Sequence, residues 1–382
     1  MQNDYDYLIV GAGFAGMVLA ERLGSIGKRC LIVERRNHIG GNCYDEKDSH
    51  GLFYHVYGPH YFRTNSVMVR EYLSRFTEWR EVNYRVCVFT QGQYWSFPVN
   101  LETFRQLKCD PRATEDDFKA YLVSHALDNP DPANAKEAVL AVAGEELYDL
   151  FYGGYTAKQW GRAPEQLDAS VTRRIPIRTN ADDRYFEDDF QAIPSEGYTR
   201  LFERMLAASR AELLLNTDYR SVRDKVRYGR MIYTGPLDEY FDCRLGALPY
   251  RTLRFDVEEL AGGEDGFIQP TLQVNYPGPE PFTRTVELKH ITGQKGGWTN
   301  LVREFPAEYK SGESEPYYPV PSAESQTLAQ LYRDLANNEP NVEFVGRLAD
   351  YRYLNMDQVV AGALHMFEKL NRPQDGGCPK AS

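Results

Sequence analysis

The apolar positions near the start of the chain change period twice, from a continuous run to a helical repeat and back to a run. Residues 8–10 are Leu-Ile-Val, residues 17–23 repeat at helical spacing, and residues 30–33 are Cys-Leu-Ile-Val. A short apolar run predicts a buried strand, and the helical repeat predicts a helix packed against it. The order strand, helix, strand indicates a βαβ unit in an α/β protein.

Farther along the chain, the spacing is helical over one long stretch and strand-like over another. Residues 100–159 repeat at helical spacing, and Thr114 with Asp117 has the sequence of a capping box at a helix start. Residues 212–288 change to short apolar runs separated by turns, which predicts a sheet. Residues 327–348 return to a helix followed by a strand.

The turn inside the first unit carries glycines at the G-x-G-x-x-G spacing. Gly11 suits the tight turn, Gly13 lets the backbone approach a pyrophosphate, and Gly16 lets helix and strand pack closely. Glu34 ends the second strand, where a carboxylate can accept hydrogen bonds from ribose hydroxyls. The pattern predicts dinucleotide binding, with a glycine-rich structural turn as the alternative.

A second glycine pair, Gly40 and Gly41, follows the acid-ended strand, as in FAD-binding proteins rather than NAD dehydrogenases. No second G-x-G-x-x-G occurs downstream, so the chain lacks a recognisable domain that would hold NADPH beside a flavin. We predict an α/β fold, a Rossmann-like FAD-binding domain with a helical insertion and an antiparallel sheet layer. The predicted parts are a discontinuous FAD-binding domain (1–99, 186–225 and 330–372), a helical insertion with a mobile substrate loop (100–185), a β-sheet substrate domain (226–329) and a flexible tail (373–382).

The composition of the chain limits the classes of partner that it can bind. The formal charge of −11 disfavours binding to nucleic acid or to an anionic membrane, and no window approaches the roughly 20 apolar residues of a membrane span. Six cysteines without a Cys-x-x-Cys pair indicate reduced thiols in a cytoplasmic protein, rather than a disulfide framework or a zinc site. An anionic substrate would therefore have to be bound by local arginines.

Arginines are dense between residues 173 and 184. Arginine's fork suits phosphate oxygens, but Arg173, Arg178 and Arg184 can instead pair with Asp182 and Asp183 on solvated loops. For each of these three arginines, ion pairing is the favoured interpretation.

Several motifs in a fixed order resemble the bacterial UDP-galactopyranose mutases over nearly the whole chain. These motifs are GAGFAG, YGPHYFRT, YTAKQWG, RRIPIRTNADDRYF, IPSEGYT, PFTRTVELKH, EPYYPV and FVGRLADYRYLNMDQ. The resemblance implies a flavoenzyme that interconverts pyranose and furanose forms of a nucleotide-activated galactose. In that family the reduced FAD forms a covalent bond from its N5 to the sugar, without net redox change. The resemblance also implies a homodimer and an external electron donor.

The resemblance assigns roles to individual residues. The implied catalytic residues are Arg174, Arg284 and His60. The implied substrate-binding residues are Arg63, Tyr155, Trp160, Tyr185, Asn275, Tyr318, Tyr353 and Asn355. The implied cofactor-binding residues are Gly11, Gly13, Gly16, Glu34, Arg35, Gly41, Asn42, His60, Arg347 and Met356.

Two positions depart from the family pattern. Arg63 stands where the family commonly has histidine, and Asn355 stands where it commonly has aspartate. Both exchanges raise the local positive potential, which suggests adaptation to another sugar. Asn355 with Gln358 also has the sequence of a capping box, a purely structural role.

The sequence leaves three other functions open. The first is the same ring contraction on another sugar nucleotide, such as a dTDP- or UDP-linked 6-deoxy or N-acetyl galactose. The others are an FAD amine oxidase or desaturase, and a flavin-binding protein without activity.

Overall fold

A five-stranded parallel sheet forms the first part of the fold in the computed structural model, which describes residues 4–372. The predicted flexible tail lies outside the described residues. The strand order is β10-β2-β1-β11-β17, and every neighbouring pair is parallel. The strands are β1 (Tyr5–Val10), β2 (Cys30–Val33), β10 (Glu212–Leu214), β11 (Tyr228–Tyr233) and β17 (Val342–Phe344). The predicted strand-helix-strand unit is confirmed as β1, α1 and β2.

Helices bury the apolar faces of this sheet. α1 (Phe14–Ser25), α8 (Tyr198–Ser209) and α12 (Met356–Asn371) share one hydrophobic core with the strands. α1 is apolar along almost its whole length, because it lies between α8, α12 and the sheet. This arrangement fixes the N-terminus of α1 at the carboxyl end of β1, where parallel α/β sheets bind their ligands.

A second, seven-stranded sheet has the order β16-β12-β15-β14-β13-β7-β8. Its strands are β7 (Val86–Thr90), β8 (Gln93–Phe97), β12 (Tyr250–Ala261), β13 (Gln273–Asn275), β14 (Arg284–Val286), β15 (Trp298–Glu308) and β16 (Tyr318–Pro319). All neighbours are antiparallel except β13 and β7, which are parallel. The predicted antiparallel sheet layer is therefore confirmed, with one parallel pair that makes the sheet mixed.

Sheet membership differs from the predicted boundaries at two places. β7 and β8 lie within the range predicted for the FAD-binding domain, 1–99, but they hydrogen-bond into the second sheet. β11 lies within 226–329, predicted as substrate domain, but it pairs with β1 in the parallel sheet. In both places the paired strands are distant in sequence, so their pairing leaves no local pattern.

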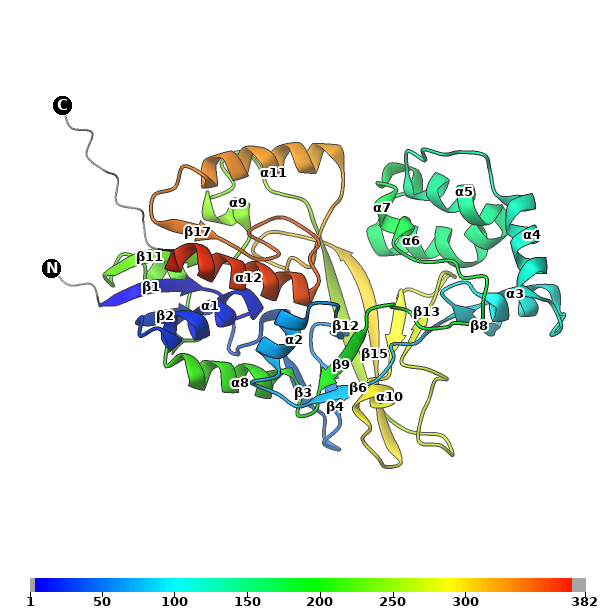
Figure 1. Ribbon diagram of the computed structural model, residues 1–382, viewed down its shortest axis with the longest axis horizontal. Coiled ribbons are helices and arrows are strands. Elements are labelled where there is room, and N and C mark those ends of the chain that lie inside the picture. The colour runs from blue at the N-terminus through cyan, green and yellow to red at the C-terminus, as the bar shows by residue number, and fades with distance from the viewer. Residues whose placement is uncertain (1–3, 373–382) are drawn as a thin grey trace.

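The predicted helical insertion is a cluster of helices at the far end of the second sheet. Its members are α3 (Leu101–Lys108), α4 (Glu115–His125), α5 (Ala135–Leu147), the π-helix η2 (Tyr148–Tyr152), α6 (Gly153–Trp160), the short η3 (Pro164–Gln166) and α7 (Ser170–Arg173). The predicted capping box of α4 is confirmed, since Thr114 and Asp117 each accept a backbone N–H from the other. Figure 1 shows these helices and the parallel sheet at opposite ends of the molecule, with β12 and β15 between them.

Small elements connect these parts. They are η1 (Gly41–Cys43), β3 (Asp45–Lys47), β4 (Phe53–His55), β5 (Phe62–Thr64), α2 (Val67–Leu73), β6 (Trp79–Glu81), β9 (Phe190–Pro194), η4 (Tyr219–Ser221), α9 (Leu237–Tyr240), α10 (Lys289–Thr292) and α11 (Ala323–Ala336). β5, β9 and β6 form a three-stranded antiparallel sheet. No helix within residues 4–372 combines the length and apolar character needed to cross a bilayer.

Candidate active site

A cavity of about 670 Å³ is lined by both halves of the molecule. Its lining includes residues from 10–15, 33–43, 57–63, 174–188, 315–318 and 346–359, together with Arg284 and Glu304. The volume suits a ligand of drug or cofactor size. One part of its lining is rich in glycine and the other in arginine and tyrosine.

The glycine-rich part leaves space for a pyrophosphate. Gly11 has φ +99°, and a Cβ there would lie 2.2 Å from the Thr234 hydroxyl oxygen. A Cβ on Gly16 would lie 2.0 Å from the Gly11 carbonyl oxygen, so Gly16 packs the turn and does not line the cavity. Gly41, with φ +57°, faces Gly13 across the cavity wall: a Cβ on Gly41 would lie 3.1 Å from the Gly13 Cα. Gly11 and Gly16 thus allow the tight turn to form, and the absence of side chains at Gly13 and Gly41 keeps open the cradle at the N-terminus of α1.

Glu34 holds this turn in place. Its Oε2 accepts the Ala12 N–H at 2.8 Å, and its Oε1 accepts the Arg36 N–H at 2.9 Å. Each carboxylate oxygen keeps a lone pair available for a ribose hydroxyl. Glu34 therefore lines the cavity and also stabilises the glycine-rich turn.

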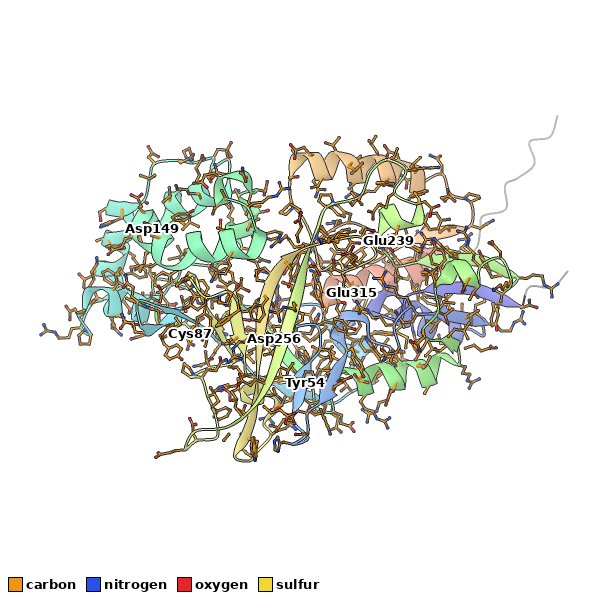
Figure 2. All side chains as sticks on the ribbon, turned by 180° about the vertical axis from the view of Figure 1, so that it is seen from behind. Tyr54, Cys87, Asp149, Glu239, Asp256 and Glu315 are labelled. Carbon is orange, nitrogen blue, oxygen red and sulfur yellow. The ribbon has the colours of Figure 1, made fainter. Side chains whose placement is uncertain are left out.

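Arg35 and Arg36, which follow Glu34, both form ion pairs with Glu315, on the segment that joins β15 and β16 of the second sheet. Arg35 pairs with Glu315 at 2.8 Å and with Glu239 at 3.6 Å, while Arg36 pairs with Glu315 at 2.7 Å. Arg36 also donates to Asn42 Oδ1 at 2.9 Å. Figure 2 shows Glu315 between the long strands of the second sheet and the parallel sheet. One carboxylate thus connects the segment that joins β15 and β16 to the dinucleotide end of the cavity.

His60 lines the cavity as a neutral base. Its Nδ1 lies 2.8 Å from the Gly58 carbonyl oxygen, which accepts only from a protonated nitrogen, so Nε2 carries the lone pair. Burial lowers the pKa of His60 to about 3. The backbone N–H of His60 donates to His55 Nδ1 at 2.9 Å, which fixes the loop. His60 can therefore accept a hydrogen bond from a cofactor or substrate at any working pH.

Three guanidinium groups meet at the other part of the cavity. Arg174 lies 5.0 Å from the Tyr353 ring centroid, and Arg347 lies 4.9 Å from those of both Tyr353 and Tyr318. Arg284 pairs with Glu304, its Nη2 lying 2.7 Å from Oε2. Within residues 4–372, neither Arg174 nor Arg347 has a carboxylate at ion-pair distance, and Arg347 Nε and Nη2 are buried without a hydrogen-bond partner.

Buried guanidinium donors without partners are costly, and they indicate a site that receives an anion. The positive charge of these arginines also lowers the pKa of a neighbouring phenol, that of Tyr353. Burial alone would raise the pKa of Tyr353, but Arg174 and Arg347 outweigh it and lower this pKa to about 8. Tyr318, whose ring lies 5.7 Å from the Tyr353 ring, has its pKa raised by burial and stays protonated.

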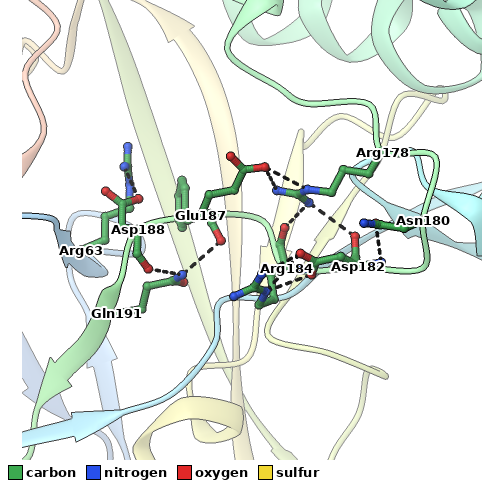
Figure 3. Close-up of polar contacts among 9 residues, drawn as sticks. Arg63, Arg178, Asn180, Asp182, Arg184, Glu187, Asp188 and Gln191 are labelled. Atoms are coloured by element: carbon green, nitrogen blue, oxygen red, sulfur yellow. Dashed lines mark hydrogen bonds and ion pairs between the residues drawn. The ribbon is translucent and has the colours of Figure 1, made fainter.

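Arg63 lines the same cavity, but its charge is offset. It donates to Asp188 Oδ2 at 2.7 Å, and its guanidinium lies 4.2 Å from the Phe186 ring centroid (Figure 3). The neighbouring Asp188 carboxylate therefore offsets the positive charge that Arg63 brings to the cavity.

Asn355 lines the cavity at the start of α12. Its backbone N–H donates to Gln358 Oε1 at 2.9 Å, so this half of the capping interaction predicted from the sequence is present. Met356 also lines the cavity, and the Cys43 thiol contacts its sulfur at 3.5 Å.

The remaining predicted substrate residues lie in or beside the cavity wall. Tyr185 lines the cavity, whereas Tyr155, Trp160 and Asn275 stand behind its surface. Trp160 packs 6.4 Å from the Tyr318 ring. Asn275 pairs across β13 and β14 with Arg284, and its side-chain oxygen accepts from Gln273 Nε2 at 2.7 Å.

Two of the four dense arginines before residue 185 form ion pairs, whereas Arg173, for which the sequence also favours ion pairing, has no carboxylate at ion-pair distance within residues 4–372. Arg184 pairs with Asp182 at 2.8 Å, as favoured from the sequence. Arg178 pairs instead with Glu187, at 3.0 Å (Figure 3). Asp183 pairs with Arg85. These pairs leave Arg174 as the arginine of this segment that faces the anion site.

Sequence reasoning missed several residues of the cavity. They are Arg36, Tyr84, Gln273, Glu304 and Glu315. Arg36 adjoins the predicted Arg35, so the same signal could have found it. The others sit in strands or loops whose composition does not distinguish them. Within residues 4–372, no cluster of three or more His, Cys, Asp or Glu side chains could hold a metal ion.

The fold and the cavity define a Rossmann-like α/β protein in which a glycine-rich cradle and a cluster of guanidinium groups line one cavity. The sequence profile described as UDP-galactopyranose mutase matches residues 150–353, and that described as NAD(P)-binding Rossmann-like domain matches residues 9–76. The chain belongs to the UDP-galactopyranose mutase family.

Relatives match nearly the full length. The chain is 37% identical to a probable UDP-galactopyranose mutase of Klebsiella pneumoniae, over 95% of this chain and 94% of that one. It is 35% identical to a dTDP-fucopyranose mutase of Escherichia coli, over 94% and 96%. A crystal structure of reduced UDP-galactopyranose mutase has the same fold, with a TM-score of 0.75 at 17% identity over 97% and 94% of the two chains.

Proposed function

We propose that the protein converts UDP-galactopyranose to UDP-galactofuranose and back, with reduced FAD as its cofactor. The observation that carries this proposal is the single cavity that combines a dinucleotide cradle with three guanidinium groups and one paired carboxylate. A nucleotide sugar carries the diphosphate that such a site would bind. The chain's membership of a pyranose–furanose mutase family supports the reaction type.

The residues present fit a flavin dinucleotide. Gly11, Gly13 and Gly41 leave the room a pyrophosphate needs, Glu34 has lone pairs for ribose, and Arg347 has unpartnered donors for phosphate oxygens. Asn42 and Met356 also line this cavity. Reduced FAD would supply a nucleophilic nitrogen, N5, toward the anomeric carbon and regain its electrons when the bond reopens, without net redox.

The protein's own residues would stabilise the charge on the leaving diphosphate and hold this group in position. As the bond between the anomeric carbon and the diphosphate breaks, negative charge grows on the leaving diphosphate, where Arg174 and Arg284 would stabilise it. Tyr318 and Tyr353 would donate to the same oxygens and hold the leaving group for its return. His60, neutral, would accept a hydrogen bond at Nε2 and not compete for the anion.

The nearest alternative is the same chemistry on another sugar nucleotide. The Escherichia coli relative is named a dTDP-fucopyranose mutase and is nearly as similar as the Klebsiella pneumoniae relative. Arg63, which departs from the family pattern, lines the cavity as a pair with Asp188 and next to Phe186. A 6-deoxy or N-acetyl galactose linked to dTDP or UDP is therefore the second candidate substrate.

An amine oxidase is the remote alternative. The fold is shared with putrescine oxidase, with a TM-score of 0.61. Over 59% of this chain, the sequence is 25% identical to that of an L-amino-acid oxidase of Crotalus adamanteus. The cluster of Arg174, Arg284 and Arg347 would repel a cationic amine, so this function is disfavoured. An external electron donor, a homodimer and a cytoplasmic location complete the proposal.

The test is turnover by purified protein reduced with dithionite. UDP-galactopyranose, dTDP-fucopyranose and UDP-N-acetylgalactosamine would be supplied separately, and their anomeric signals followed by NMR. A furanose signal from UDP-galactopyranose that is absent without reduction supports the proposal. A furanose signal from only one of the other sugars would establish the alternative substrate. Oxygen consumption with an amine, without any furanose, would overturn both.

A further inference from the structure

Helix α6 lies on the turn that leads into Arg284. This turn, residues 276–283, connects β13 to β14 and contains three prolines at positions 277, 279 and 281. The Tyr276 N–H donates to the Thr283 carbonyl at 2.9 Å and closes the turn. Prolines have no N–H, so the turn's other carbonyls need partners from elsewhere.

Lys158, on α6, supplies two of those hydrogen bonds. Its Nζ donates to the Tyr276 carbonyl at 2.7 Å and to the Phe282 carbonyl at 3.2 Å, one at each end of the turn. Gly154 lies four residues earlier on the same helical face, where a Cβ would lie 2.3 Å from the Pro277 carbonyl oxygen. Helix and turn are thus in direct contact along one full helical turn.

The neighbouring residues on α6 reach the anion site. Tyr155 is close enough to Arg284 for the guanidinium to oppose the rise in the Tyr155 pKa that burial causes. Trp160 packs against Tyr318. Arg284 follows Thr283 directly, and the Thr283 N–H donates to the Glu304 carbonyl at 2.9 Å. Any shift of the turn would therefore move both Arg284 and its carboxylate partner.

We propose that Lys158 is a positioning residue that joins α6 to the turn before Arg284 and so sets the distance between Arg284 and the wall formed by Tyr155 and Trp160. This role rests on the proposed function, since it concerns the same diphosphate site. Lys158 itself does not line the cavity. Its removal should weaken the binding of the nucleotide without releasing the cofactor.

The chain offers a matched control. Lys289 is also a lysine whose Nζ donates only to backbone carbonyls, those of Gly266, Gly296 and Trp298 at 2.7, 2.6 and 2.9 Å. It is buried and lies outside the cavity lining. Lys289→Met also removes hydrogen bonds from a lysine to backbone carbonyls, but from a loop that does not carry Arg284. Its effect on UDP affinity therefore measures the consequence of lost stability alone.

The experiment compares wild type, Lys158→Met, Lys158→Arg and Lys289→Met as FAD-loaded full-length proteins. UDP affinity is measured by titration, and FAD content and Tm are measured alongside. Lys158→Met should bind UDP about tenfold more weakly with unchanged FAD content, because small displacements of a binding group are costly. Lys158→Arg should recover most of the affinity, since its guanidinium can also donate to both carbonyls. Lys289→Met should lower the Tm and leave UDP affinity within about twofold.

Two results would overturn this role for Lys158. One is UDP affinity of Lys158→Met within about twofold of wild type, and the other is an equal loss of affinity in Lys289→Met. A wild-type protein that retains FAD but does not bind UDP would instead overturn the proposed function, and this role with it.

Discussion

UDP affinity should fall as the pH rises above about 8, because Tyr353 then loses its proton. Burial would raise the pKa of this phenol, but Arg174 and Arg347 lower it to about 8 from the usual 10. A phenolate neither donates to a diphosphate oxygen nor tolerates its charge. The other groups that face Tyr353 do not titrate here: the arginines stay charged, and burial raises the pKa of Tyr318 and Tyr185.

The magnitude follows from proton linkage. If UDP binds only the protonated site, its dissociation constant should increase about tenfold per pH unit above 8, until Tyr353 also ionises in the complex. Ionisation of free Tyr353 has the opposite effect on folding. A phenol whose folded-state pKa is depressed adds stability as the pH rises from 8 to 10 and loses it as the pH falls back through 8. Ligand-free protein should thus gain this contribution in the range where UDP affinity declines.

The assay is UDP titration between about pH 7 and pH 9.5, with the ultraviolet absorbance of tyrosinate recorded in parallel. UDP should suppress part of the tyrosinate signal at high pH. The Tyr353→Phe variant should bind UDP a few-fold more weakly at about pH 7, since one hydrogen bond is lost, and its affinity should not change with pH. A constant wild-type affinity across this range would refute the reasoning. The same slope in the variant would assign the titration to another group.

Three further experiments, two of them with a control variant, test the cofactor and substrate ends of the cavity. Gly11→Ala should abolish FAD retention, because its Cβ would lie 2.2 Å from a threonine oxygen, whereas Gly27→Ala, also at positive φ but in open space, should retain FAD by absorbance. Arg174→Ala should lose at least about a hundredfold in turnover and keep its FAD, and Arg173→Ala should stay near wild type in the same NMR assay. Arg63→His should change the ratio of turnover between UDP- and dTDP-linked sugars by about tenfold. An unchanged ratio would exclude residue 63 from sugar choice.

Local patterns in the sequence predicted the parts of the fold that depend on local physics. The glycines of the first turn, the apolar runs of β1 and β2 and the capping box at Thr114 each involve neighbours within a few residues. The parallel pairing of β13 with β7 has no such signal, because the two strands are far apart in the chain and read like any other short strands. The sequence therefore did not predict that β7 belongs to the same sheet as β13.

Charge balance in the site could not be predicted in the same way. Asp188 cancels the charge of Arg63 from 125 residues away, and Glu304 pairs with Arg284 across two antiparallel strands. Which carboxylate meets which arginine depends on the folded arrangement of the sheets. The sequence therefore indicated where arginines gather, but not which of them keep an unbalanced charge.

Glu315 links the second sheet to the dinucleotide end of the cavity. Its segment is fixed to β12, since the Thr252 hydroxyl donates to the Glu315 carbonyl at 2.6 Å and the Tyr317 N–H donates to the Arg251 carbonyl at 3.0 Å. The Glu315 carboxylate in turn forms ion pairs with Arg35 and Arg36. A dinucleotide bound beside these arginines would therefore contact side chains whose positions are set by the second sheet.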